Sequence, residues 1–223
     1  MFEMTKHMVI AIDGPAGSGK STVSKKVARS LGLLYIDTGA MYRSLTLKAM
    51  KHSIDLGNES ALTDLARSTR IDLKEADRLE VFMDGDNVTD LIRTPEVTNN
   101  IKYIACVPGV RHEMVKLQRL MGKRDGAVME GRDITTVVFP DADYKFYLDA
   151  DADERARRRH KELIESGQRV ELNIIKEDVI ARDKSDFTRS VGPLVKASDA
   201  IVIDTTGLSI DEVVNKILAY IKK

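Results

Sequence analysis

Apolar residues along the chain follow two alternating patterns. Short apolar runs, several rich in β-branched residues, are typical of buried strands. These runs are residues 8–12, 33–36, 127–129, 144–148 and 200–203. Between them lie stretches in which apolar residues recur with the period of a helix, namely 20–31, 40–52, 110–123, 153–184 and 210–221, the last after a plausible cap at Ser209. This alternation predicts an α/β protein with a parallel five-stranded sheet flanked by helices, and a ligand site at the carboxyl ends of the strands.

The stretch from Met8 to Ser21 carries the most specific motif. It reads M-V-I-A-I-D-G-P-A-G-S-G-K-S, a strand-type run followed by a match to the phosphate-binding pattern G-x-x-x-x-G-K-[ST] and then by a helical pattern. The glycines let backbone N–H groups approach an anion, and the helix N-terminus favours negative charge. Lys20 adds a cation for the β- and γ-phosphates, and the Ser21 hydroxyl can ligate Mg²⁺. A chance match in a turn is the alternative, but the strand–loop–helix context favours a nucleoside triphosphate site.

One segment interrupts the alternation of strands and helices. In residues 70–88, apolar residues recur with a period of two on both sides of a polar break, and Asp84-Gly85 is a tight-turn signal. This pattern predicts a small antiparallel insertion, which with its flanking helices spans residues 58–104. In a phosphotransfer protein such an insertion often carries the second substrate, but a merely structural hairpin fits the pattern nearly as well.

Polar residues crowd the ends of two other predicted strands. Residues 37–43 read D-T-G-A-M-Y-R, and an acidic residue, a hydroxyl and an arginine in this order could clamp a phosphate. The alternative is an ordinary helix cap by Asp37 or Thr38 with a solvated Arg43. Residues 130–133 read E-G-R-D, and charged residues at the end of a buried strand are costly unless they pair or bind a ligand. For this second group the functional interpretation is favoured.

Arginines are concentrated late in the chain. Residues 153–159 read D-E-R-A-R-R-R, and three arginines share one face of a helix there: Arg155, Arg158 and Arg159. A second set, spaced i, i+4 and i+7, consists of Arg182, Asp186 and Arg189. The sequence S-G-Q at 166–168 is a plausible hinge between them. Such runs are often solvated faces, but phosphoryl transfer depends on positioning and cationic stabilisation, so we interpret them as an Arg-bearing lid that closes over the phosphates and excludes water.

The composition and the absence of certain motifs weigh against several classes of function. The 223-residue chain has 35 Lys and Arg against 35 Asp and Glu, so its net charge is zero and we expect no nucleic-acid or membrane partner. The single Cys106 cannot form an internal disulfide, and the sequence shows neither a membrane-spanning apolar run nor a signal-peptide pattern. We therefore expect a cytoplasmic protein. The histidines lack metal-ligand spacing, and the absence of an N-K-x-D motif weighs against a GTPase switch.

Four stretches together resemble bacterial cytidylate kinases, which are nucleoside monophosphate kinases. They are I-D-G-P-A-G-S-G-K-S, D-T-G-A-M-Y-R, E-G-R-D-I-T-T-V-V-F-P-D-A and R-D-x-x-D-x-x-R-S-V-G-P-L. The resemblance runs from residue 8 to the C-terminus. It implies a P-loop NTPase-type fold with a monophosphate-binding insertion and an Arg-rich helical lid. The expected parts are a core of about 8–57, 105–150 and 190–223, the insertion at about 58–104 and the lid at about 151–189.

The resemblance implies MgATP-dependent phosphorylation of CMP and dCMP, and it assigns roles to the candidate residues. ATP would contact Gly14, Pro15, Ala16, Gly17, Ser18, Gly19, Lys20, Ser21, Thr22 and Arg158. Mg²⁺ would be held by Ser21, with Asp13 acting through water. The substrate side would use Thr38, Arg43, Arg132 and Arg189 near the CMP phosphate, Arg111 and Asp133 at cytosine, Arg182 and Asp186 at the ribose, and Asp37 as a further substrate-binding residue. The implied catalytic cations are Lys20, Arg132, Arg155, Arg159, Arg182 and Arg189.

The implied roles agree with elementary chemistry. Cytosine presents an amino donor and ring acceptors, so an Asp–Arg pair is complementary to its edge. The attacking phosphate oxygen is already anionic at neutral pH, so no strong general base is required. Cations are needed instead to hold two anionic substrates together, and the bidentate arginine fork suits this better than lysine.

Two positions depart from the family pattern. Lys102 stands where a serine facing cytosine is expected, so either Asn99 or Asn100 supplies that contact or base selectivity is altered. Glu130 stands where an aspartate is also familiar. The competing hypotheses are a kinase of another small acceptor, such as UMP, AMP or a hydroxylated metabolite, and a nucleotide-binding protein without activity. A monomer is expected.

Overall fold

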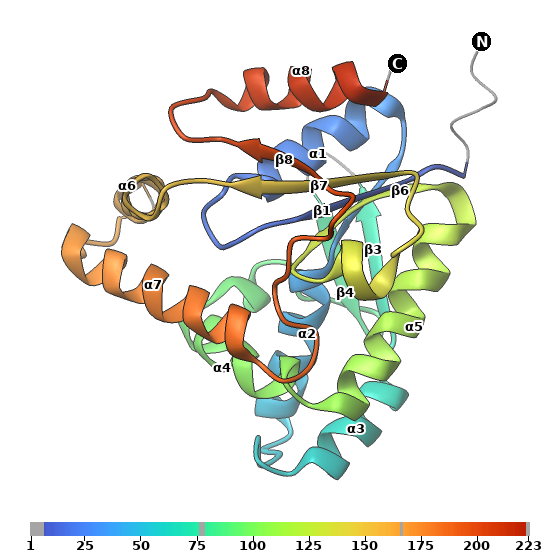
Figure 1. The fold of residues 1–223 in the computed structure, drawn as a ribbon. Coiled ribbons are helices and arrows are strands. Elements are labelled where there is room, and N and C mark those ends of the chain that lie inside the picture. Colours follow the sequence, from blue (N-terminus) through green and yellow to red (C-terminus); the bar gives the residue numbers. More distant parts are fainter. Residues whose placement is uncertain (1–6, 76–78, 166, 222–223) are drawn as a thin grey trace.

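The computed structural model describes residues 7–75, 79–165 and 167–221. Its central element is a β-sheet. The strands are β1 (Val9–Asp13), β2 (Leu34–Asp37), β6 (Ala127–Gly131), β7 (Tyr144–Asp149) and β8 (Ile201–Asp204). They are hydrogen-bonded in the order β2-β6-β1-β7-β8, and every pairing is parallel (Figure 1). The predicted parallel sheet of five strands is confirmed. Strands β1, β2 and β8 each lie one residue later than predicted, and β6 and β7 end two residues and one residue later.

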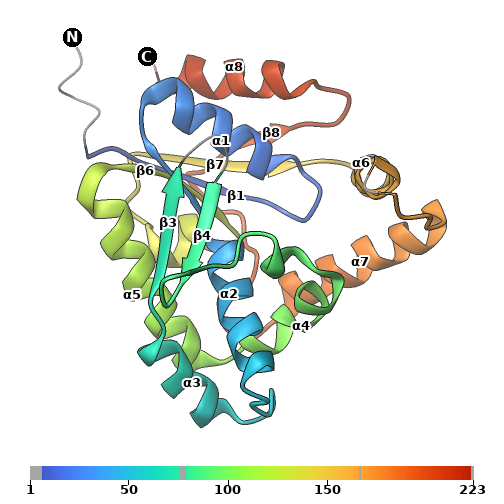
Figure 2. The same ribbon diagram turned by 180° about the vertical axis from the view of Figure 1, so that it is seen from behind.

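Helices cover both faces of the sheet. Helices α1 (Lys20–Leu31) and α8 (Ile210–Ile221) lie side by side on one face, and α2 (Thr38–Lys51) and α5 (Pro108–Asp125) lie on the other (Figure 1 and Figure 2). With both faces covered, β1 and β6 are buried along their whole length. None of the described helices is long and apolar enough to cross a membrane.

Side-chain caps account for the start of two of these helices. Asp37 precedes α2, and its Oδ1 accepts a hydrogen bond from the Ala40 N–H at 2.8 Å. A reciprocal pair precedes α8, because Ser209 Oγ accepts from the Glu212 N–H at 3.3 Å while Glu212 Oε2 accepts from the Ser209 N–H at 2.8 Å. The predicted cap at Ser209 is confirmed. Helix α2 begins two residues before the predicted 40–52, since Asp37 caps it directly.

The predicted antiparallel insertion forms a separate three-stranded sheet. It comprises α3 (Glu59–Ser68), β3 (Ile71–Glu75), β4 (Leu79–Met83), β5 (Asp86–Asn87), the 3₁₀ turn η1 (Leu91–Arg93) and α4 (Pro95–Ala105). The Asp84-Gly85 turn joins β4 to β5, with positive φ at both residues (53° and 97°). Buried apolar side chains of this part, such as Val81 and Ile92, belong to the same continuous core as those of the main sheet. The insertion is therefore packed against the sheet domain and shares its core.

The stretch predicted as one helical segment, 153–184, forms two helices. These are α6 (Ala152–Glu165) and α7 (Leu172–Thr188), which pack on each other beyond the carboxyl end of β7 (Figure 1). The Gly167 N–H bonds the Ile164 carbonyl at 2.9 Å, and Gly167 has a φ of 82°, a conformation that ends a helix. Ser166 of the predicted hinge lies outside the described residues. Ala156, Ile175 and Val179 form a small apolar cluster of their own, distinct from the main core.

One element had no counterpart in the hydrophobic pattern. Residues Ile134–Val138 form a π-helical turn, η2, soon after β6. Asp13 at the end of β1 holds its start, accepting hydrogen bonds from the Ile134 N–H at 2.9 Å, the Thr135 N–H at 2.8 Å and Thr135 Oγ1 at 2.6 Å. Because a residue distant in sequence organises this turn, local sequence signals did not predict it.

Candidate active site

The phosphate-binding loop lies between β1 and α1 and approaches neighbouring backbone closely. A Cβ atom added to Gly14 would lie 2.1 Å from the Leu148 carbonyl oxygen, and one added to Gly17 would lie 3.0 Å from Arg155 Cβ. Only glycine fits at such distances. Gly19 precedes α1 with a φ of 84° and has no side-chain cap, so the first N–H groups of the helix remain available to an anion. Ser21 and Thr22 are exposed on the first turn of α1.

Lys20 is almost fully buried under this loop. Its Nζ donates to the Pro15 carbonyl at 3.1 Å and lies 4.0 Å from Glu130 Oε2. Burial, together with the guanidinium of Arg132, lowers the pKa of Lys20 to about 7 against the opposing effect of Glu130. A phosphate placed beside this amine would raise the pKa again. Lys20 is therefore arranged to be cationic when an anion is bound.

Glu130 is held by a residue that sequence reasoning missed. Tyr35, buried on β2, donates its hydroxyl hydrogen to Glu130 Oε1 at 2.6 Å. The other carboxylate oxygen, Oε2, is the one that faces Lys20. Thr38 Oγ1 donates to the Glu130 backbone carbonyl at 2.7 Å, which ties the start of α2 to the end of β6. Nothing in the local pattern around Tyr35 indicated this contact, because β2 and β6 become neighbours only in the folded sheet.

The motif at residues 37–43 combines both interpretations offered by the sequence. Asp37 is the cap of α2, and its Oδ2 lies 3.0 Å from Arg43 Nη2. The alternative of a solvated Arg43 is wrong, since only 17% of its side chain is exposed. Arg43 Nε is buried and has no hydrogen-bond partner among the described residues. A buried donor without a partner is costly, so this atom indicates the position of a missing acceptor.

A second group brings together Arg111, Asp133 and Arg189. Arg111 and Asp133 form a buried ion pair, and Arg189 Nη2 lies 3.9 Å from Asp133 Oδ1. Burial raises the pKa of Asp133, while the guanidinium of Arg111 acts in the opposite direction. Gly192 lies directly against the pair, because a Cβ atom there would be 2.2 Å from Arg111 Nη2, and its carbonyl accepts from Arg189 Nε. Gly192 was part of the R-S-V-G-P-L stretch but had no role assigned.

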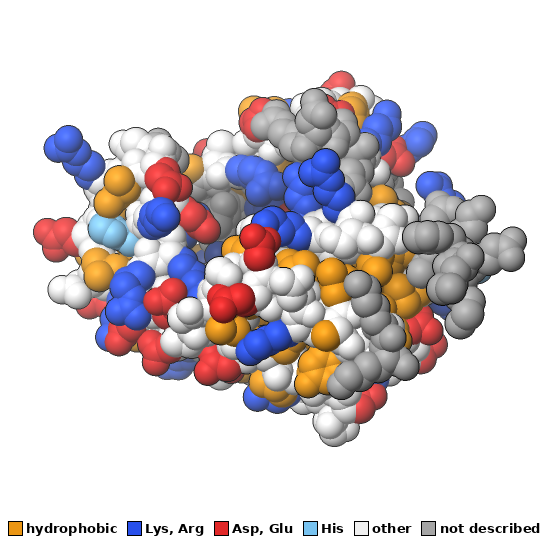
Figure 3. All heavy atoms as spheres, turned by 90° about the horizontal axis from the view of Figure 1, so that it is seen from above, with side chains coloured by type: hydrophobic (Ala, Val, Ile, Leu, Met, Phe, Trp, Pro, Cys, Tyr) orange, Lys and Arg blue, Asp and Glu red, His pale blue; other side chains and the backbone are white. Residues whose placement is uncertain are grey.

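Positive charge is concentrated between these two groups. Arg132 Nε donates to Asp186 Oδ2 at 2.6 Å, and Arg182 has no hydrogen bond or ion pair among the described residues. Burial and the guanidinium of Arg132 lower the pKa of Arg182 to about 10. Arg132 and Arg182 also lower the pKa of Lys20, so these three cations are close enough to repel one another. Elsewhere, acidic and basic side chains are mixed over the face shown in Figure 3.

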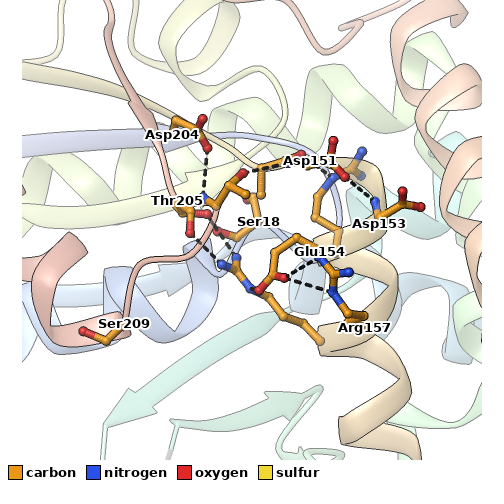
Figure 4. A network of polar contacts seen from close by, with 12 residues as sticks. Ser18, Asp151, Asp153, Glu154, Arg157, Asp204, Thr205 and Ser209 are labelled. Atoms are coloured by element: carbon orange, nitrogen blue, oxygen red, sulfur yellow. Dashed lines mark hydrogen bonds and ion pairs between the residues drawn. The ribbon is translucent and has the colours of Figure 1, made fainter.

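The arginines of α6 have different surroundings. Arg155 is buried, forms a bidentate ion pair with Asp183 of α7 (3.0 and 2.6 Å) and donates to the Ala16 carbonyl at 3.2 Å. Arg158 donates to Glu154 and Thr205, the two acceptors labelled in Figure 4. Arg159 pairs with Glu162 at the surface, with 51% of its side chain exposed. The structure thus brings Arg155 and Arg158 to the phosphate-binding loop and leaves Arg159 in solvent.

The donor set fits Mg²⁺ only together with phosphate oxygens. No three His, Cys, Asp or Glu side chains lie together as a metal-binding group in the part of the chain that the structure describes. Mg²⁺ is commonly bound by one or two protein oxygens plus substrate phosphates and water, and the exposed Ser21 hydroxyl is the oxygen expected to serve here. Both carboxylate oxygens of Asp13 accept hydrogen bonds from η2, so a water-mediated contact from Asp13 to Mg²⁺ stays a prediction.

Asp13 also gives the fold a pH dependence that can be measured. Burial raises the pKa of Asp13 from 3.8 to about 6, against the effect of its three hydrogen bonds. Between these values the folded chain keeps a proton that the unfolded chain has released, so the free energy of unfolding falls as pH rises through this window. Compared with Asp13→Asn, we expect the wild type to lose about 2 kcal/mol between about pH 4 and about pH 6.5. Urea denaturation of both proteins at each pH measures this difference, and parallel pH profiles would contradict it.

The departure at Lys102 lies on the surface of α4. Lys102 is exposed on α4 and lies over the ring of its neighbour Tyr103, at 5.0 Å from the centroid. Asn99 is exposed, and Asn100 donates to the Glu96 carbonyl at 3.0 Å. None of these side chains is buried beside the Arg111–Asp133 pair.

Comparison with known proteins agrees with this geometry. Residues 10–223 match the family model described as cytidylate kinase. A cytidylate kinase of Desulforamulus reducens is 53% identical over 220 residues, covering 99% of both chains, and one of Anoxybacillus flavithermus is 50% identical over 221 residues, covering 99% of this chain and 98% of that protein. An uncharacterized protein of Eubacterium ventriosum shares the fold alone, with a TM-score of 0.55 at 14% identity, over 97% of this chain and 99% of that one. From the extent of the family match and these identities, the chain belongs to the cytidylate kinase family.

Proposed function

We propose that this chain transfers the terminal phosphoryl group of MgATP to CMP and dCMP, giving ADP and CDP or dCDP. The family and the names of its relatives support this activity. The donor nucleotide would occupy the loop from Gly14 to Thr22, and the acceptor would occupy the space between Arg43 and the Arg111–Asp133 pair. Phosphoryl transfer is catalysed mainly by positioning and by electrostatic stabilisation, and both are available here.

The observation that carries the proposal is the gathering of cations beside the phosphate-binding loop, only some of which are paired with carboxylates. Arg132 and Arg182 lower the pKa of Lys20, Arg132 also lowers the pKa of Arg182, and the buried Arg43 Nε has no hydrogen-bond partner among the described residues. Phosphate oxygens would relieve both the repulsion between these cations and the cost of the buried donor that lacks an acceptor. With a neutral hydroxylated metabolite as acceptor, the donor nucleotide alone would bring negative charge to the site. A nucleoside monophosphate adds a second anion, which suits the site better.

Recognition of the base would rest on the Arg111–Asp133 pair. The Asp133 carboxylate can accept a hydrogen bond from the amino group of cytosine, and Arg111 can donate to a ring acceptor. Uracil carries an oxygen at the place of the amino group, so it would meet the carboxylate with no donor. Arg189 and Gly192 lie against the Arg111–Asp133 pair and would fix its geometry.

Different residues would bind the donor phosphates, the acceptor phosphate and Mg²⁺. Lys20 and the loop N–H groups bind the phosphates of the donor, while Arg43 and Arg132 hold the phosphate of the acceptor. Because the acceptor phosphate is anionic, no residue needs to remove a proton from it. Bound Mg²⁺, with Ser21 as its protein oxygen, would neutralise phosphate charge. The packed pair α6 and α7 would exclude water from the site.

An acceptor profile tests the proposal. MgATP turnover, followed by ADP release in a coupled assay, should be highest with CMP and dCMP, and far lower with UMP, AMP, GMP and shikimate. Omitting the acceptor is the control and should leave only background ATP hydrolysis. Best turnover with UMP or AMP would keep the donor site and overturn the base assignment. Absence of acceptor-dependent turnover would favour the non-catalytic alternative.

We further propose that the protein acts as a monomer in the cytoplasm. All residues assigned to the donor and acceptor sites come from one chain, so the reaction requires no second copy. The single exposed Cys106 is compatible with a reducing compartment.

A further inference from the structure

Two contacts hold the phosphate-binding loop from its outer side. The Ala16 carbonyl accepts from Arg155 Nη1 at 3.2 Å, and the Ser18 carbonyl accepts from Thr205 Oγ1 at 3.1 Å. In a trans peptide group the C=O and the following N–H point in opposite directions. Holding these carbonyls therefore directs the N–H groups of Gly17 and Gly19 toward the opposite side of the loop. Such N–H groups are what a phosphate-binding loop offers to its anion.

Thr205 is placed for this contact by the sheet. It follows β8 directly, is 2% exposed and donates its N–H to the Asp149 carbonyl at the end of β7 (2.8 Å). Its hydroxyl oxygen lies 3.1 Å from the Ser18 carbonyl and 3.0 Å from the Asp149 carbonyl. The hydroxyl has a single hydrogen, which these two carbonyls share as acceptors.

The same residue binds α6. Arg158 Nη1 donates to Thr205 Oγ1 at 3.0 Å, and Arg158 Nη2 donates to the Thr205 carbonyl at 2.6 Å. Glu154 accepts from Arg158 Nε at 3.1 Å and keeps the guanidinium in this orientation (Figure 4). Because a hydroxyl donates and accepts at once, Thr205 links the loop to the lid helix through a single side chain.

We propose that Thr205 is a positioning residue for the donor nucleotide: its hydroxyl holds the Ser18 carbonyl and Arg158 so that the loop is shaped for triphosphate before the nucleotide binds. This inference rests on the proposed role of the loop as the ATP site. It does not depend on which acceptor is phosphorylated, since Thr205 contacts neither Arg43 nor the Arg111–Asp133 pair.

Direct binding of MgATP by calorimetry, without acceptor, tests the inference. Thr205→Val removes the hydroxyl and keeps the branched shape. We expect the dissociation constant for MgATP to rise about tenfold, because the Ser18 carbonyl and Arg158 each lose a hydrogen-bond partner. Thr205→Ser restores the hydroxyl and should bring the value back to within about threefold of wild type. Steady-state kinetics should show the same rise in KM for ATP with an unchanged KM for CMP.

Thr206→Val is the matched control. Thr206 is exposed in the same loop, and its hydroxyl accepts from the Asp151 N–H at 3.0 Å without touching the phosphate-binding loop. This variant should bind MgATP as the wild type does. If Thr205→Val does not fold, Thr205→Ala removes the same hydroxyl and gives the same comparison.

The outcomes separate the inference from the proposed function. Wild-type affinity for MgATP in folded Thr205→Val overturns the inference, as does an equal rise in KM for both substrates or unfolding of every variant, Thr205→Ser included. Failure of the wild type itself to bind MgATP contradicts the proposed function. Binding of MgATP with a different best acceptor contradicts only the acceptor assignment and leaves the inference standing.

Discussion

Lys20→Ala should lower kcat on the order of 10² to 10³-fold while the chain remains folded. The amine is 7% exposed, lies beside the loop and is surrounded by groups that orient it: the Pro15 carbonyl and Glu130. In phosphoryl transfer, charge develops on the oxygens of the moving group, and a preoriented cation stabilises that charge without reorganisation. Removal of the amine leaves the buried Glu130 carboxylate with the Tyr35 hydroxyl, so the fold retains a partner for it.

The measurement is steady-state turnover with saturating MgATP and CMP, with circular dichroism and thermal unfolding to verify the fold. Lys26→Ala is the matched control, because Lys26 lies on the same helix and pairs with Asp211 at the surface (2.7 Å, side chains 48% and 76% exposed). Its kcat should stay within about twofold of wild type, as expected for an exposed ion pair. Unchanged kcat in Lys20→Ala would show that the phosphate-binding loop is wrongly assigned.

Asp133→Asn should raise KM for CMP by about 100-fold and change the dissociation constant for MgATP by less than about twofold. The substitution keeps the shape of the side chain and replaces one carboxylate oxygen by an NH2 group, which donates and cannot accept a hydrogen bond from the cytosine amine. It also removes the counter-charge of Arg111, which is 4% exposed. Breaking a buried ion pair in this way should lower the free energy of unfolding by about 3 kcal/mol.

Substrate titrations with CMP and calorimetry with MgATP separate the two effects, and urea denaturation measures the stability. Asp72→Asn is the control: Asp72 lies on β3 and forms a surface pair with Arg70 at 2.8 Å, so its loss should affect neither substrate. Equal weakening of CMP and MgATP would count against base recognition at Asp133. A shift of the best acceptor from CMP to UMP would strengthen the assignment.

The hydrophobic pattern predicted the main sheet and its covering helices because strands and helices bury side chains with different periods. The phosphate-binding loop was equally visible, since its glycines, Lys20 and Ser21 are adjacent in sequence. The insertion was recognised from the period-two pattern and the Asp84-Gly85 turn. The hinge predicted at 166–168 falls between α6 and α7, although residues 153–184 were predicted as one helical stretch, because charged residues on both sides continue the helical pattern across the hinge.

What only the tertiary structure decided is the pairing of the charged groups. From the sequence, Arg155, Arg158 and Arg159 were equivalent members of one face; in the fold, Asp183 holds Arg155, Thr205 holds Arg158, and Arg159 remains at the surface. The contacts from Tyr35 to Glu130, from Asp13 to η2 and from Thr205 to Ser18 join residues 95, 121 and 187 positions apart. Periodicity and motifs report on neighbours along the chain. A buried polar group, by contrast, needs a hydrogen-bond partner, and that partner can come from any part of the chain that the fold places beside it. The sequence by itself therefore determined the elements and the chemistry available. The tertiary structure determined which cations are already paired and which polar atoms, like Arg43 Nε, still lack a hydrogen-bond partner among the described residues.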